Sequence, residues 1–169
     1  MVVDEFTPIG SSRPTLNLGA YIPQVPKLHK LDLRVEFLRT AHTSEFPPGF
    51  VYFDFRRFRS GYTNDGNLLA SWIGRAGRGT QAWATYWVSP RTKIQLGYRL
   101  QMVYKDFVEG GRLSDYSIRG EHALGSNLSF SGFLQYEKWW FPILSSTNES
   151  NVTASLQITL YPGKLFKKK

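Results

Sequence analysis

The sequence predicts an all-β protein, an antiparallel meander of eight or nine strands joined by hairpins. The first observation is the segment TKIQLGYRLQMVYK at residues 92–105, in which apolar side chains alternate with polar or small ones. A period of two residues is typical of a strand with one apolar and one polar face. The second observation is that no segment shows the 3.6-residue period of a helix. The third is that 15% of the residues are aromatic, which favours strands.

Other segments alternate in the same way and follow one another along the chain. The expected strands are residues 15–22, 31–39, 50–58, 81–88, 92–105, 114–124, 127–140 and 151–161, with residues 68–73 as a ninth, short strand. Residues 1–14 are expected to form an irregular lead-in, and residues 167–169 a basic tail in solvent. We therefore expect residues 1–169 to form a single β-barrel domain.

The alternation alone leaves open whether the apolar faces meet lipid or a protein core. The later strands are long, about 10–14 residues, whereas strands of globular proteins peak near 5–6. Short turns at 89–91 and 125–126 alternate with longer loops at 106–113 and 142–149, as in outer-membrane barrels. Tyrosine and tryptophan also gather at strand ends, as in interfacial girdles. These features favour an outer-membrane barrel, closed or open, over a soluble all-β sandwich or lipocalin-like barrel.

Composition excludes several other classes. The chain has no cysteine, which excludes disulfide frameworks and thiolate metal sites. Its apolar runs are far shorter than the ~18 residues of a transmembrane helix, and residues 1–22 lack the apolar core of a signal peptide. The formal net charge of +8 suggests a polyanionic partner. Nucleic acid is not expected, because most aromatic residues lie at strand ends or on apolar faces rather than beside the basic residues.

The sequence contains no motif of a known catalytic site. There is no GxSxG or HExxH motif, and the three histidines lie in different segments. We therefore expect no catalytic residues, no metal and no cofactor.

Six segments together resemble a known family. They are KLDLRVEF (30–37), GYTNDG (61–66), SWIGRAGRG (71–79), QAWATYWVSP (81–90), DFVEGG (106–111) and QITLYP (157–162). In order and spacing they resemble the C-terminal part of capsule assembly proteins of the Wzi family, over most of residues 15–162. The resemblance implies a non-enzymatic β-barrel of the bacterial outer membrane that helps to assemble or attach capsular polysaccharide.

Family members are longer than this chain, with more strands, a signal peptide and helical elements. The resemblance therefore implies that the chain is the C-terminal half of a larger barrel, with two unpaired sheet edges unless it closes. The implied partners are outer-membrane lipid, a surface polysaccharide and the missing N-terminal half. The polysaccharide is expected to be acidic if it binds the basic residues of this chain. Two alternatives remain: an outer-membrane pore that attracts anions, and a soluble all-β carbohydrate-binding module.

The basic and aromatic segment 57–79 is the first candidate binding site. Arginines can hold carboxylates or phosphates of an acidic glycan through paired hydrogen bonds, and aromatic rings can stack on sugars. The candidate polysaccharide-binding residues are Arg57, Arg59, Tyr62, Trp72, Arg75 and Arg78. In the alternative interpretation, Arg75 and Arg78 pair with barrel carboxylates such as Asp54 or Glu137.

The polar faces of the strands form the second candidate. The residues expected to line a barrel lumen are Arg34, Glu36, Gln95, Arg99, Gln101, Arg119, Glu121 and Gln135. The three arginines would attract anions if unpaired. We favour instead an ion-pair network with Glu36, Glu121 and Glu137, because opposite charges are available on the same faces.

The expected topology depends on residues 68–73. If they do not span the sheet, loop 59–79 lies outside the cell with loops 106–113 and 142–149. If they span it, only residues 75–79 remain external. We favour the first topology. It places the whole of segment 59–79, which is rich in glycine and arginine, outside the cell, where it can contact a capsule.

Overall fold

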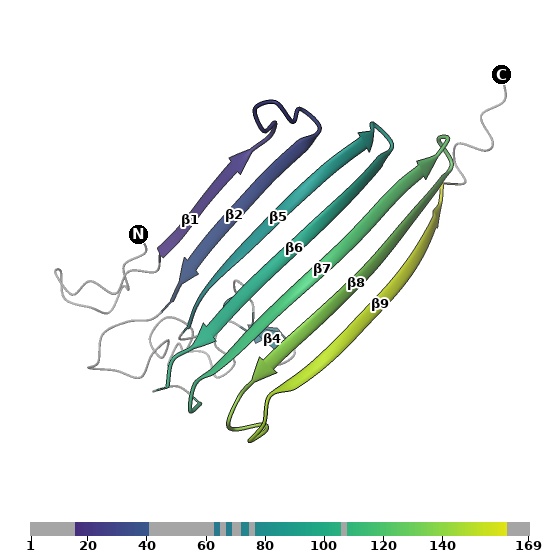
Figure 1. Cartoon of the computed structure of the whole chain (residues 1–169). Coiled ribbons are helices and arrows are strands. Elements are labelled where there is room, and N and C mark those ends of the chain that lie inside the picture. Colours follow the sequence, from purple (N-terminus) through teal and green to yellow (C-terminus); the bar gives the residue numbers. More distant parts are fainter. Residues whose placement is uncertain are drawn as a thin grey trace.

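The computed structural model describes residues 16–40, 63–64, 67–68, 72–74, 77–105 and 108–161. These residues form one antiparallel sheet of seven strands and a separate two-stranded ribbon (Figure 1). The strands are β1 (Leu16–Ile22), β2 (Leu31–Arg39), β3 (Thr63–Asn64), β4 (Asn67–Leu68), β5 (Gly77–Ser89), β6 (Thr92–Val103), β7 (Gly111–Leu124), β8 (Leu128–Trp140) and β9 (Glu149–Leu160). None of the described residues is helical, so they include no helix that could cross a membrane.

The sheet is an open meander in the order β1-β2-β5-β6-β7-β8-β9, which confirms the predicted fold class. Strands β5 to β9 have 12 to 14 residues each. β1 and β9 are the edge strands and pair on one side only. The main sheet thus has fewer strands than the eight or nine expected. The predicted strand at 50–58 lies outside the described residues.

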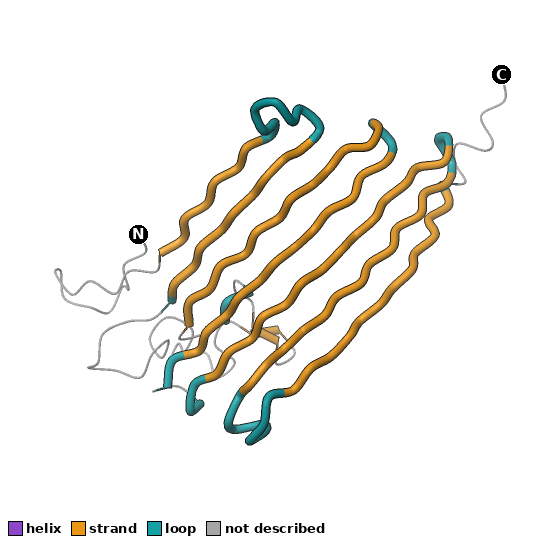
Figure 2. The backbone as a smooth tube through the Cα atoms, in the orientation of Figure 1, coloured by secondary structure: helices purple, strands orange, loops and turns teal. Residues whose placement is uncertain are grey.

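The connections fall at two ends of the sheet, which we call the turn end and the loop end (Figure 2). The connections β1–β2, β5–β6 and β7–β8 start and finish at the turn end, and the connections β2–β5, β6–β7 and β8–β9 start and finish at the loop end. Gly125 has a φ of 66° in the tight connection between β7 and β8, a left-handed conformation that glycine adopts without strain. The predicted alternation of short and long connections is confirmed for β5 to β9.

The ninth expected strand, at 68–73, does not span the sheet. β2 pairs directly with β5, so no strand from the segment between them lies between β2 and β5 in the sheet. Leu68 belongs to β4, which pairs only with β3, and Trp72 and Ile73 form a turn. The connection between β2 and β5 therefore starts at Thr40 and rejoins the sheet at Gly77, both at the loop end, as the two other long connections do.

The register sorts the side chains onto two unlike faces, because directly paired residues of antiparallel strands point to the same side. One cross-strand row consists of Ala20, Val35, Ala82, Tyr98, Tyr116, Tyr136 and Val152. The adjacent row on the other side consists of Gly19, Glu36, Gln81, Arg99, Asp115, Glu137 and Asn151. We call these sides the apolar face and the polar face.

The buried apolar core of the described residues is small and lies at the loop end. Its two members are Ile73, which is 1% exposed, and Leu38, which is 6% exposed. Leu38 is paired with Gly79 on the polar face. The turn at Trp72–Ile73 covers this face, and the side-chain amide of Gln101 donates a 3.0 Å hydrogen bond to the carbonyl oxygen of Ile73. β5 begins four residues earlier than predicted, because Gly77 and Gly79 pair with β6.

The close approach at Gly79 makes a first prediction. An added Cβ there would lie 2.4 Å from the carbonyl oxygen of Leu100, 2.6 Å from Trp72 and 2.7 Å from Ile73. Gly79→Ala is therefore expected to lower the free energy of unfolding by about 1–3 kcal/mol. Urea unfolding in detergent micelles, followed by circular dichroism, measures the change.

The matched control is Gly120→Ala, because a Cβ at Gly120 meets nothing within 4 Å. This control is expected to be as stable as the unsubstituted chain or slightly more so, since alanine suits a strand better than glycine. Equal stability of the two variants would contradict the packing of Trp72 and Ile73 against β5.

Candidate functional site

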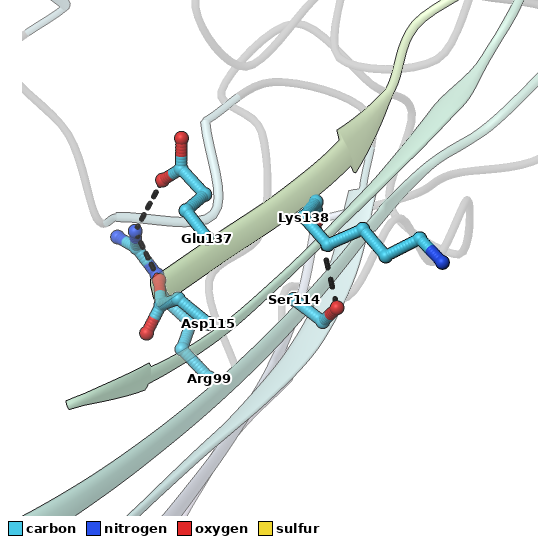
Figure 3. Close-up of polar contacts among 5 residues, drawn as sticks. All are labelled: Arg99, Ser114, Asp115, Glu137 and Lys138. Atoms are coloured by element: carbon cyan, nitrogen blue, oxygen red, sulfur yellow. Dashed lines mark hydrogen bonds and ion pairs between the residues drawn. The ribbon is translucent and has the colours of Figure 1, made fainter. Parts of the chain in front are cut away.

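An ion-pair cluster occupies the middle of the polar face (Figure 3). Arg99 of β6, Asp115 of β7 and Glu137 of β8 belong to one cross-strand row. The guanidinium of Arg99 lies 2.6 Å (Nε) and 2.5 Å (Nη2) from Oδ2 of Asp115, and Nη2 lies 3.7 Å from Oε2 of Glu137. Asp115 is only 5% exposed. One arginine thus lies between two carboxylates, and its charge is more than compensated.

A second polar cluster lies nearer the turn end and includes two indole rings. Arg34 pairs with Glu36 on the same strand, and its guanidinium lies 5.2 Å from the ring centre of Trp83. The indole N–H of Trp87 donates a 2.8 Å hydrogen bond to Asp32. Together with Gln95 and other residues, these side chains line an open hollow of about 740 Å³.

The same cluster extends across β5, β6 and β7. Lys93 pairs with Glu121 at 2.9 Å and lies 5.4 Å from the ring centre of Trp87. The side-chain amide of Gln95 donates a 3.1 Å hydrogen bond to the hydroxyl of Thr85. Indole rings beside carboxylates and amides can stack on and hydrogen-bond to sugar rings. Cations already lie over both indoles, so a ligand would meet only their remaining surfaces.

The polar face carries more negative than positive charge, although the whole chain has a net charge of +8. The register places four basic residues of the seven strands on this face: Arg34, Lys93, Arg99 and Arg119. It places six acidic residues there: Asp32, Glu36, Asp115, Glu121, Glu137 and Glu149. Four positive and six negative charges give −2, so the strands of this face do not favour anions. This balance argues against the anion-attracting pore.

All eight residues predicted to line a lumen lie on the polar face. The favoured ion-pair network forms in part. Arg34 pairs with Glu36, and Arg99 pairs with Glu137. Glu121, however, pairs with Lys93 rather than with an arginine, and the guanidinium of Arg119 lies 5.2 Å from the ring centre of Phe133. That the polar face lines a lumen remains a prediction.

The candidate residues named from the sequence do not include Asp32, Lys93, Asp115, Trp83, Trp87 or Thr85, although the alternation already puts Asp32 and Lys93 on the polar face. Two sequence signals were available. Asp115 has the same parity as Ser117 and Arg119, so extending the alternation by one step would place it on the polar face. Trp83 and Trp87 also have polar-face parity, but at a strand end they resemble girdle residues. The register shows that both share the polar face, with Arg34 and Lys93 as their direct partners.

The predicted polysaccharide site is only partly described. Arg57, Arg59, Tyr62 and Arg75 lie outside the described residues. Trp72 covers Gly79 on the polar face, and its indole nitrogen is buried with no hydrogen-bond partner among the described residues. Arg78 is adjacent to Gly79 within β5 and is exposed on the apolar face. Trp72 and Arg78 thus lie on opposite sides of the sheet, because successive strand residues alternate.

Arg78 therefore does not pair with Glu137. This result contradicts the alternative interpretation, which expected that pair. Glu137 lies on the polar face and contacts Arg99, whereas the row of Arg78 on the other face contains Arg39, Met102, Arg112 and Trp140. Asp54 lies outside the described residues. The structure brings no three potential metal ligands together within its described part.

The central cluster makes a second prediction. Asp115→Ala removes the nearest carboxylate from Arg99 in a nearly buried place, so we expect a loss of about 1–3 kcal/mol in the free energy of unfolding. The control is Glu121→Ala, which breaks the more exposed pair with Lys93 and is expected to cost less than about 1 kcal/mol. Urea unfolding in micelles measures both. A larger loss for the Glu121 variant would contradict the central role of Asp115.

A model of the family described as capsule assembly protein Wzi matches residues 3–154. No curated protein and no solved structure matches the chain. The family match covers most of the chain and includes six of the seven strands of the sheet completely and part of the seventh. The chain therefore belongs to the Wzi family of capsule assembly proteins.

Proposed function

We propose that this chain is a non-enzymatic part of a bacterial outer-membrane β-barrel that takes part in assembling or attaching capsular polysaccharide at the cell surface. Membership of the Wzi family supports the role in the capsule. The exposed apolar face of the sheet supports the location in a membrane, and it is the observation that carries the proposal.

Large apolar side chains cover one side of the sheet without being buried by another part of the described structure. Leu156 is 77% exposed and Tyr116 is 58% exposed, and Leu18, Ile118 and Leu134 are exposed as well. Contiguous apolar surface on this scale marks contact with a membrane or a partner. Lipid satisfies such a face without a second layer of protein.

The extent of the apolar face suits an outer membrane. On β8 it runs from Leu128 to Tyr136, which is roughly 27 Å along the strand at 3.4 Å per residue. At a barrel tilt of about 40° this distance corresponds to about 21 Å, close to the ~25 Å apolar band of outer-membrane barrels. Trp140 lies beyond it at the loop end, where an interfacial girdle would lie.

The two edge strands support a larger barrel. β1 and β9 each leave one row of backbone groups without a partner strand in the sheet, and such groups cannot face lipid unpaired. We propose that further strands of the same protein, the N-terminal half of the barrel, pair with these edges. The loop end would then face outward, toward the polysaccharide.

The proposed membrane location makes a third prediction. Leu96 lies on the apolar face between Ala84 and Ile118. Leu96→Arg would place a charge in the apolar band and is expected to cost about 2–4 kcal/mol. The matched control is Gln135→Arg, which places the same charge on the polar face opposite the uncharged Ser117 and Thr153 and is expected to cost much less. Urea unfolding from phosphatidylcholine vesicles measures both. Equal losses would contradict contact between the apolar face and lipid.

The proposed role in the capsule makes a fourth prediction, tested in cells. Deleting the gene is expected to move capsular polysaccharide from the cell surface into the medium, because the barrel would no longer attach it. Capsule staining and a uronic acid assay of cells and medium measure the shift, and reintroducing the gene is the control. Unchanged surface polysaccharide would overturn the proposed role. Recovery of the complete gene product in a detergent-free supernatant would overturn the proposed location.

A further inference from the structure

Four basic residues of the sheet lie on the apolar face, all near the loop end. Arg39, Arg78 and Arg112 belong to one cross-strand row, which also contains Met102 and Trp140. Lys138 lies in the next row, and in Figure 3 its side chain points away from the side that carries Arg99. All four side chains are exposed. We call Arg39, Arg78, Arg112 and Lys138 the basic rim.

The charges of the basic rim are not balanced by the sheet. The strands place four basic and no acidic residues on the apolar face, so these strands contribute +4 there. No rim residue forms an ion pair within the described part of the chain, whereas Arg34, Lys93 and Arg99 on the polar face each have a carboxylate partner. The basic rim is therefore a place where an external anion is favoured.

The register also places like charges opposite each other. Arg39 and Arg78 are direct cross-strand partners, and like charges in this arrangement destabilise a sheet. An anion bound between them would remove the repulsion. Arg78, Arg112 and Lys138 also line a hollow of about 790 Å³ together with Lys105 and one acidic residue, Glu109. The lining of this hollow thus remains positive.

We propose that the basic rim binds the phosphate groups of phosphorylated lipids in the outer leaflet of the membrane. The inference rests on the proposed membrane location, which puts the apolar face against lipid and the basic rim at the height of the headgroups. Guanidinium groups suit phosphate, because their N–H groups form paired hydrogen bonds with its oxygens. From β2 to β7 the row spans three strand spacings, about 14 Å, which is wide enough for more than one phosphate.

The position of the basic rim favours a lipid over a soluble polyanion. The apolar side chains of Phe37, Leu100 and Tyr136 lie on the same face immediately toward the turn end. A ligand with phosphates at one end and acyl chains at the other matches this order of basic and apolar surface. A capsular polysaccharide would match the charge but not the apolar surface beside it.

The experiment uses the whole chain folded in neutral detergent micelles, with native mass spectrometry to obtain dissociation constants. Diphosphoryl lipid A is the probe. Arg78→Gln combined with Arg112→Gln is expected to weaken its binding about 30-fold, since each basic residue near an anionic lipid surface contributes about a factor of five. The unsubstituted chain is expected to bind dephosphorylated lipid A much more weakly than the diphosphoryl form.

Two further variants separate loss of charge from loss of structure. Arg78→Lys combined with Arg112→Lys keeps the charge, so its affinity is expected to lie closer to that of the unsubstituted chain than to that of the glutamine variant. Lys30→Gln combined with Arg91→Gln removes two charges at the turn end, roughly 34 Å along the strands from the basic rim. Because charges at that distance are screened, this control is expected to bind lipid A as the unsubstituted chain does. Circular dichroism verifies that each variant is folded.

The inference would be overturned by unchanged lipid A binding by the folded glutamine variant, by equal binding of dephosphorylated lipid A, or by displacement of lipid A by equimolar inorganic phosphate. Loss of acidic polysaccharide binding alone in the glutamine variant would also overturn it, because the basic rim would then contact the capsule. The capsule assays measure polysaccharide on the cell surface and not lipid A affinity, so they test the proposed capsule role separately from the basic rim. Lipid A binding without any effect of gene deletion on the capsule would overturn the capsule role and support the basic rim, and the reverse result would overturn only the basic rim.

Discussion

The register of the antiparallel ladders is the constraint on which the rest of this structure depends. Directly paired residues share a face, so the pairing of β6 with β7 and of β7 with β8 brings Arg99, Asp115 and Glu137 together. A slip of one residue would exchange the faces along the slipped strand. It would place a nearly buried carboxylate among Leu and Tyr side chains, where it would lose its partner. The ion pairs of the polar cluster and the separation of apolar side chains onto the other face therefore favour the same register.

The two faces also divide the charge of the chain between them. Within the strands, the polar face carries charges of both signs and is slightly acidic. The charged residues of the apolar face are all basic, and they lie only near the loop end. A net charge of +8 calculated from composition conceals this division. The partner suggested by the charge thus depends on the face, and the phosphate groups of a lipid are favoured at the basic rim, whereas anions are not favoured along the strands of the polar face.

Much of the fold and part of the candidate site follow from alternation. The period of two residues locates the strands of the main sheet and assigns all eight predicted polar-face residues to one side. It does not place Arg78, because Gly77 and Gly79 suppress the strand signal at the start of β5, where β6 supplies the pairing partners. Nor does it identify the partner of Arg99, since Asp115 and Glu137 lie on other strands and only the register brings them near.

The sequence by itself determined the all-β class, the length and order of the later strands, and the existence of two unlike faces, because these are local properties of a chain with a two-residue period. Only the tertiary structure decided that β2 pairs with β5, that Trp72 and Ile73 cover the polar face, and that Arg39, Arg78, Arg112 and Lys138 form one basic rim. These features join residues far apart in the chain. The pairing between strands brings these residues together in space, and no local sequence pattern encodes that pairing.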